Sequence, residues 1–279
     1  MRRNFVIITS IGLSGLFFGL FGCENDRNSD QICKNNPQLC ADLHRDSWCR
    51  YEKGDLIRHR YQLMNSQTPS GKQLFDLLIH LEDYSNCIEL AAGVEHILHP
   101  ERTQDRKRAF AVSTQTLAEL REYTKDNPDL HLAYYRWLRF NDFPSLQIVL
   151  DQFAQGLVND NQIKASLASH FVRIDQAKSK ALYLELLSVD DPDGFNTDWL
   201  LGLASVYQRL QDFENAYLFT KANILMTDNK ADERQLLGFI NGNKQLANQL
   251  DTQAQALVDS IESGNFATSE IGQKLINLQ

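Results

Sequence analysis

The sequence holds little of what an enzyme or a nucleic-acid-binding protein needs. Its 279 residues carry 28 Lys and Arg against 36 Asp and Glu, a formal net charge of −8. This shortage of positive charge argues against nucleic acid, because phosphate neutralisation supplies most of that affinity. A G-x-S-x-G nucleophile motif is absent. Ser70-Gly71-Lys72 fails the phosphate-loop pattern, because Ser66 and Gln73 stand where Gly and Ser or Thr are required. These absences favour a non-enzymatic protein that binds no nucleic acid.

A metal site is not indicated either. His96 and His99 lie three residues apart, which would let both face one ion from a helix. No third ligand is convincingly placed, so the pair is typical of a solvated helix end. We therefore expect no metal and no cofactor.

Long hydrophobic runs are restricted to the start of the chain. Arg2 and Arg3 precede the uncharged run 5–21, an arrangement typical of a secretory signal peptide over residues 1–22. A retained membrane helix is the alternative, although the run is short and diluted by glycine. Its end, Leu20-Phe21-Gly22-Cys23, resembles the lipobox of bacterial lipoproteins. That resemblance implies cleavage before Cys23, a diacylglycerol and an N-acyl chain on Cys23, and attachment to a lipid bilayer. Glu24, where aspartate would imply inner-membrane retention, implies the periplasmic face of the outer membrane.

Cysteine is scarce, and its count is informative. Four cysteines remain after Cys23, and an even number in an exported chain predicts two disulfides, with three possible pairings. Their spacing does not resemble that of zinc ligands. Cys33–Cys49 with Cys40–Cys87 is favoured, because Cys40 and Cys87 each fall on a predicted helix.

Alternating apolar and polar runs with hairpin turns are lacking, so little or no sheet is expected. Apolar residues instead recur every three or four positions, which predicts an all-α fold of antiparallel helical hairpins. We expect a flexible tether over 23–32, a loop-rich segment stapled by disulfides at the start of a helical region 33–158, and a helical-repeat region 159–279. Four helices with short connections are predicted in the repeat region: 161–172, 176–188, 198–210 and 212–226.

The last two of these helices resemble a tetratricopeptide (TPR) repeat, which implies a TPR-like solenoid in the C-terminal half. Gln211 departs from the pattern, because glycine is usual there. Six residues carry the resemblance and are predicted to pack the two helices together: Trp199, Leu203, Ala204, Tyr207, Phe213 and Ala216.

Most of the mature chain also resembles an uncharacterised family of gammaproteobacterial lipoproteins. Shared features are the Asn-Pro-x-Leu-Cys cluster at 36–40, the Asp-Leu-Ile stretch at 55–57 and the TPR-like C-terminal half. No activity is implied by this resemblance.

A dense group of aromatic residues lies near position 135. Tyr134, Trp137 and Leu138 share a helical face and are predicted to be core. Tyr135 and Arg139 lie four residues apart on another face, and Tyr and Arg concentrate at binding hot spots. This pair is therefore our candidate contact surface.

Together these patterns predict a lipid-anchored, non-catalytic scaffold that binds a periplasmic or outer-membrane protein partner. A cell-wall or lipid hydrolase with an unrecognised site is the first alternative. A structural spacer of the envelope is the second.

Overall fold

The computed structural model describes residues 28–189, 194–227 and 233–277. Within these ranges the chain is helical and forms no strand, which confirms the all-α prediction. The fold divides into two compact units, the first ending at Leu146 and the second beginning at Gln147. The division falls within α6 (Phe143–Ala154), earlier than the boundary expected after residue 158.

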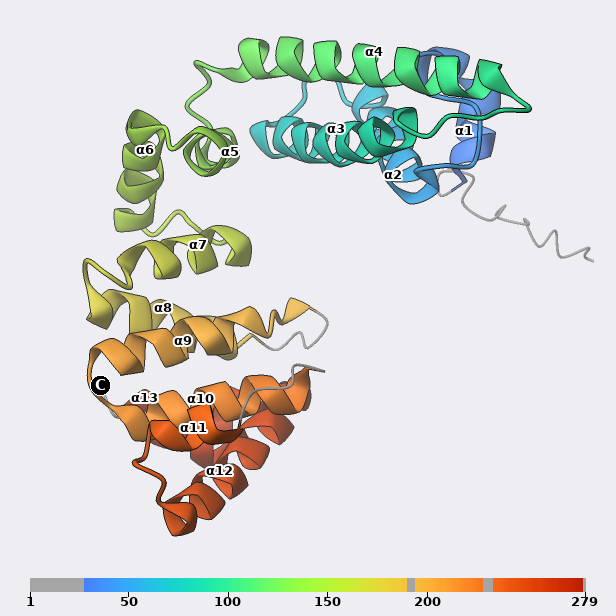
Figure 1. The fold of residues 1–279 in the computed structure, drawn as a ribbon. Coiled ribbons are helices and arrows are strands. Elements are labelled where there is room, and N and C mark those ends of the chain that lie inside the picture. Colours follow the sequence, from blue (N-terminus) through green and yellow to red (C-terminus); the bar gives the residue numbers. More distant parts are fainter. Residues whose placement is uncertain (1–27, 190–193, 228–232, 278–279) are drawn as a thin grey trace, which may run out of the picture. The chain divides into compact units, whose positions relative to one another are not determined.

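Unit 1 is built around α3 (Gly71–Ala92). This helix contacts α2 (Arg50–Met64), α4 (Pro100–Thr124) and α5 (Leu130–Phe140), and α1 (Ser29–Asn35) packs on α2. Figure 1 shows α3 and α4 lying side by side. The core of the unit is formed by fully buried apolar side chains, which include Leu56, Leu78, Leu81, Tyr84, Ile88 and Leu132.

Short polar side chains cap the first turns of several helices, and a proline begins α4. Ser70 and Gln73 form a reciprocal capping box that begins α3, and Pro100 occupies the first turn of α4, where its missing N–H leaves nothing unsatisfied. Each such cap stabilises its helix by about 1 kcal/mol. Six more helices begin at an N-cap side chain that accepts a backbone N–H, namely Asn28, Asp129, Asp160, Asp175, Asp212 and Asn243.

Two disulfides staple the start of unit 1, as predicted, but the favoured pairing is wrong. Cys33 bonds Cys40 and Cys49 bonds Cys87, with Cα–Cα distances of 5.7 and 5.8 Å. Cys40 does not lie on a helix that reaches α3. It follows a short 3-10 turn (Pro37–Leu39) that returns the chain to α1. Cys49, just before α2, lies beside α3 instead.

The predicted tether is too long. Helix α1 begins at Ser29, and Ile32, expected to be flexible, is 3% exposed in the core. Cys23 and the signal-peptide segment 1–22 lie outside the described residues. None of the described helices has the length and apolar character needed to cross a membrane.

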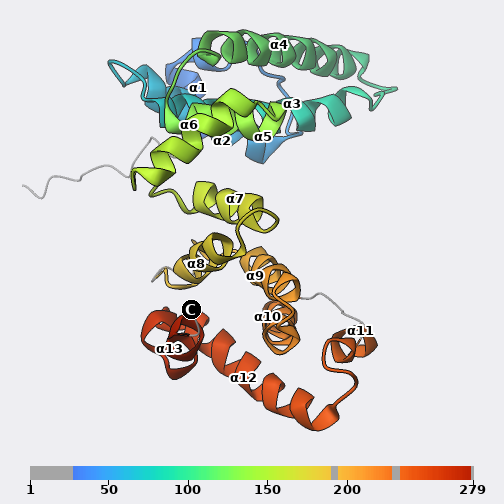
Figure 2. The same cartoon turned by 90° about the vertical axis from the view of Figure 1, so that its left-hand side faces the viewer.

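Unit 2 is a succession of helices in which contacts run mainly between neighbours. α7 packs on α8, α8 on α9, α9 on α10 and α10 on α12 (Figure 2). The four helices predicted in this region are confirmed to within one or two residues at each end. The helices are α7 (Asn161–Phe171), α8 (Gln176–Leu187), α9 (Asp198–Arg209), α10 (Phe213–Met226), α11 (Glu233–Gly238), α12 (Lys244–Glu262) and α13 (Glu270–Asn277).

Candidate functional site

Unit 1 carries an open groove of about 720 Å³, which we call the α4 groove. One wall is the loop before α2 and the other is the first three turns of α4. None of the lining residues is serine, cysteine or histidine, so the groove offers charge and hydrogen bonds rather than a nucleophile. The lining residues are Arg45, Asp46, Glu101, Arg102, Gln104, Asp105 and Arg108.

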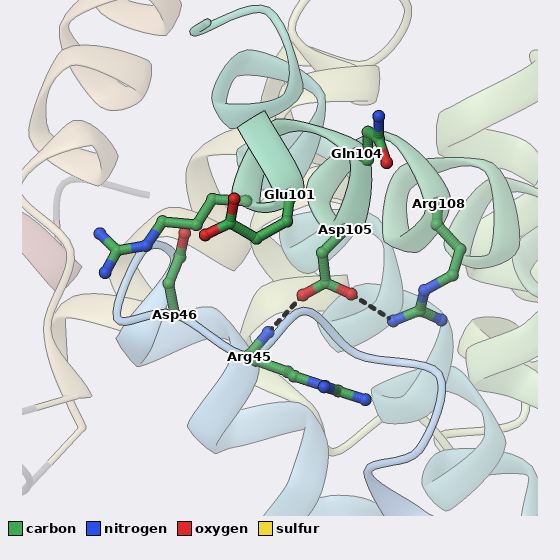
Figure 3. A pocket seen from close by; sticks show the side chains of 7 residues that line it. Arg45, Asp46, Glu101, Gln104, Asp105 and Arg108 are labelled. Atoms are coloured by element: carbon green, nitrogen blue, oxygen red, sulfur yellow. Dashed lines mark hydrogen bonds and ion pairs between the residues drawn. The ribbon is translucent and has the colours of Figure 1, made fainter. Parts of the chain in front are cut away.

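Asp105 joins the two walls of the groove. Its carboxylate accepts the Arg45 backbone N–H at 2.8 Å and the Arg108 guanidinium at 2.9 Å (Figure 3). Burial acts to raise the pKa of Asp105, but these two donors outweigh it and hold the pKa below its usual range. Asp105 is therefore an ionised structural link across the groove.

Asp46 is held on the other side by a buried arginine. Arg106, 3% exposed, donates from Nε at 2.8 Å and pairs through Nη2 at 2.7 Å. Its guanidinium also lies over the Trp48 ring, 4.7 Å from the centroid, and donates to the Ala91 carbonyl. One side chain thus fixes the loop against the end of α3, and a buried charge with this many partners is well compensated.

The loop before α2 is held against α3 by His44 and Tyr84, both buried. His44 Nε2 lies 2.6 Å from the Trp48 carbonyl, which can only accept, so Nε2 carries the proton. Nδ1 then accepts from the Tyr84 hydroxyl at 2.9 Å. Burial, together with the Lys53 ammonium, lowers the pKa of His44, while burial raises the pKa of Tyr84 to about 12. Both groups are neutral at pH 7 and serve to hold the loop.

Two cations in the α4 groove have only an electrostatic partner, Asp105 for Arg45 and Glu101 for Arg102. The guanidinium groups of Arg45 and Arg102 form no hydrogen bond or ion pair with any described residue, and both residues are exposed. Asp46 and Asp105 are already neutralised, and Glu101 interacts with His99 at 3.1 Å. The groove can therefore accept an anionic group.

The predicted contact surface is wrong for Tyr135, which is buried, whereas Arg139 is exposed. Tyr135 is 2% exposed, and its hydroxyl donates to Glu82 of α3. Arg139 donates from Nε to the other Glu82 oxygen at 2.9 Å, and Arg121 of α4 donates to the first at 2.7 Å. These residues tie three helices together around one carboxylate, and only Arg139 of the predicted pair also lies at the surface.

The core assignment for that helix holds only in part. Tyr134 is buried, but Trp137 is half-buried and Leu138 is exposed. α5 packs mainly on α3, and this packing leaves part of its apolar stripe uncovered.

The repeat residues of unit 2 are placed as expected, with one exception. Tyr207 and Phe219 stack with their ring centroids 5.4 Å apart between α9 and α10. Gly202 permits the close approach of α8, because a Cβ there would lie 2.3 Å from the Tyr183 ring. Phe213 is 45% exposed at the first position of α10, so its predicted packing role is wrong. The residues that are buried as predicted are Trp199, Leu203, Ala204, Tyr207 and Ala216.

Unit 2 has its own hollow between α10, α11 and α12, which we call the α10–α12 groove, of about 390 Å³. Asp251 accepts from Tyr217 at 2.8 Å and from Lys221 at 3.1 Å. Lys244, at the other side and exposed, bonds no described residue. Apolar side chains, among them Ile224 and Leu237, line the rest. The groove combines an uncompensated ammonium with an apolar wall, a combination that sequence reasoning missed because α11 has no strong periodic signal.

Among the residues that the structure describes, one group of potential metal ligands is brought together, by Cys49, Glu52 and Cys87. The two cysteines are bonded to each other, so neither offers the thiolate that binds metal. His96 and His99 do not converge: His99 turns to Glu101, and the backbone N–H of His96 donates to Thr103.

Residues 20–221 match the family described as "Protein of unknown function (DUF2989)". The chain belongs to this family. No match was found among curated proteins, and none among solved structures. Membership covers unit 1 and the helices up to α10, so it includes the α4 groove and stops before most of the α10–α12 groove.

Proposed function

We propose that this protein is a lipid-anchored scaffold of the bacterial envelope, attached through Cys23 at the periplasmic face of the outer membrane. The lipobox-like 20–23 segment and Glu24 support the anchor. Cys33, Cys40, Cys49 and Cys87 pair among themselves, which suits an oxidising compartment and leaves Cys23 outside the disulfides. The lipid of the proposed anchor is bound covalently, and the proposed scaffold role requires no soluble cofactor.

The observation that carries the scaffold role is the α10–α12 groove at the end of a TPR-like stack. Such stacks bury a continuous core while leaving a grooved surface for a partner. Lys244 supplies an ammonium and the wall residues Ile224 and Leu237 supply apolar contact. The fitting partner is a protein segment that presents a carboxylate next to an apolar side chain.

Charge reversal in the groove tests this proposal. Lys244→Glu in the lipidated full chain should abolish recovery of a specific envelope protein after crosslinking and mass spectrometry. Arg209→Glu, an equally exposed cation on α9, is the matched control and should leave recovery unchanged. Loss of no partner with Lys244→Glu, or equal loss with both variants, would contradict a binding site in this groove.

The hydrolase and spacer alternatives stay predictions. Among the described acids, only Asp83 has a raised pKa, through burial and the neighbouring Glu82 carboxylate. It lies beside His80, whose pKa burial lowers, in a shallow hollow that also includes Asp55. That hollow is where hydrolysis would be sought, and Asp83→Asn is the variant to assay.

A further inference from the structure

The connection between α3 and α4 exposes large apolar side chains. Ile97 is 95% exposed and Leu98 is 87% exposed, and Val94 and Leu90 beside them are also exposed. Scattered apolar residues on a surface need no explanation, but a contiguous apolar group marks a contact with a protein or a lipid.

The backbone that carries this group is fixed. The His96 N–H donates to Thr103 Oγ1 at 2.9 Å, and that hydroxyl donates to the Val94 carbonyl at 3.4 Å. Thr103 is itself buried, and Pro100 begins α4 directly after the loop. A loop held in this way cannot easily turn Ile97 and Leu98 inward, so their exposure is built into the fold.

Arginines and a tryptophan lie on or against the first turns of α4, the helix that follows the apolar loop. Arg102 lies in the first turn of α4, four residues after Leu98, and lines the α4 groove with Arg45. Trp48, 44% exposed, lies over Arg106 one turn further along α4. Exposed aliphatic residues, a tryptophan and arginines that form no hydrogen bond are the composition of a membrane-interface contact, where apolar groups enter the acyl region and guanidinium groups meet phosphates.

We propose that Val94, Ile97 and Leu98 insert into the surface of an anionic phospholipid bilayer, with Arg45 and Arg102 binding lipid phosphates. The proposal rests on the anchor at Cys23. Only residues 24–28 separate that cysteine from α1, so Ser29 lies within about 20 Å of the lipidated residue, because an extended chain spans at most about 3.5 Å per residue. Anchoring at this distance makes the second contact effectively intramolecular, so a loop of weak intrinsic affinity suffices.

Brominated lipids test the insertion directly, because bromine on acyl chains quenches only tryptophan at membrane depth. The full lipidated chain carrying Ile97→Trp is reconstituted in vesicles of phosphatidylethanolamine and phosphatidylglycerol. We expect the fluorescence added by the new tryptophan to be lost when the acyl chains are brominated. Adding Arg45→Glu and Arg102→Glu to the Ile97→Trp chain should restore most of the tryptophan fluorescence.

Ile174→Trp is the matched control, since Ile174 is also an exposed isoleucine in a turn between two helices. Its fluorescence should not be quenched. Quenching of both introduced tryptophans, or of neither, in vesicles that carry the protein overturns the proposal. If the introduced tryptophan is shielded from water in native envelopes but not in vesicles, the proposal is also overturned, in favour of a protein partner. Flotation of the wild-type chain with vesicles tests the lipid anchor by itself. A chain that does not float contradicts the anchor at Cys23 rather than the insertion of the loop.

Discussion

Glu82 shows how single residues decide the role of their neighbours. The residue is 7% exposed, and its carboxylate receives hydrogen bonds from Tyr135, Arg121 and Arg139. Burial acts to raise the pKa of Glu82, but these three donors outweigh burial and hold the pKa below its ordinary value of 4.5. A carboxyl whose pKa is lowered by folding stabilises the fold above that ordinary value, and the stabilisation is lost as the pH falls toward the folded-state pKa.

Glu82→Gln should therefore destabilise unit 1 by about 2 kcal/mol at pH 7, because two arginines lose their counter-charge but remain partly hydrated. Urea unfolding measures the difference from wild type. That difference should shrink as the pH falls below 4.5, since Glu82 of the unfolded chain is protonated first and Glu82 of the folded chain only at its lower pKa. A difference that is independent of pH down to about 3, below the ordinary carboxyl pKa, would contradict an ionised Glu82.

The same residue explains why the sequence misled us about Tyr135 and Arg139. Their spacing and residue types are those of a hot spot, but Glu82 lies 53 and 57 positions away in the chain. Only the packing of α5 on α3 brings these groups together, and no local pattern encodes that pairing. The placement of both residues on a helix was predictable, and so was the exposure of Arg139, but the burial of Tyr135 was not.

At the scale of elements, periodicity and caps were sufficient for the repeat helices, because each cap is local in sequence. The disulfide pairing was not predictable, since it depends on the short 3-10 turn Pro37–Leu39, which returns Cys40 to α1. The α4 groove was likewise hidden, because its walls come from residues near 45 and near 105 that meet only in the fold.

Gln211 between α9 and α10 gives a prediction for the hairpin that these two helices form. It adopts a φ of +59°, in the left-handed region where a side chain is strained. Gln211→Gly should raise the free energy of unfolding by up to about 1 kcal/mol. Gln208→Gly, an exposed position inside α9, should instead lower it by about 1 kcal/mol. If both variants lower the free energy of unfolding in urea by the same amount, Gln211 does not adopt the left-handed conformation.

At the scale of the molecule, each unit has its own core, and the two disulfides lie in unit 1. In the chain-entropy description, the 33–40 loop contributes about 2.5 kcal/mol and the 49–87 loop about 4 kcal/mol. Cys49→Ser with Cys87→Ser should therefore accelerate amide hydrogen exchange in peptides of unit 1 and leave α7 to α10 unchanged. Faster exchange throughout both units would show that the chain unfolds as one cooperative body.

Attachment through Cys23 underlies both the scaffold role and the proposed bilayer contact. The intact mass of the protein extracted from the envelope tests it most directly, with Cys23→Ala as the control. The expected mass is that of a chain beginning at Cys23 with a diacylglycerol and an N-acyl group. A chain that retains residues 1–22 and carries no lipid would contradict the anchor.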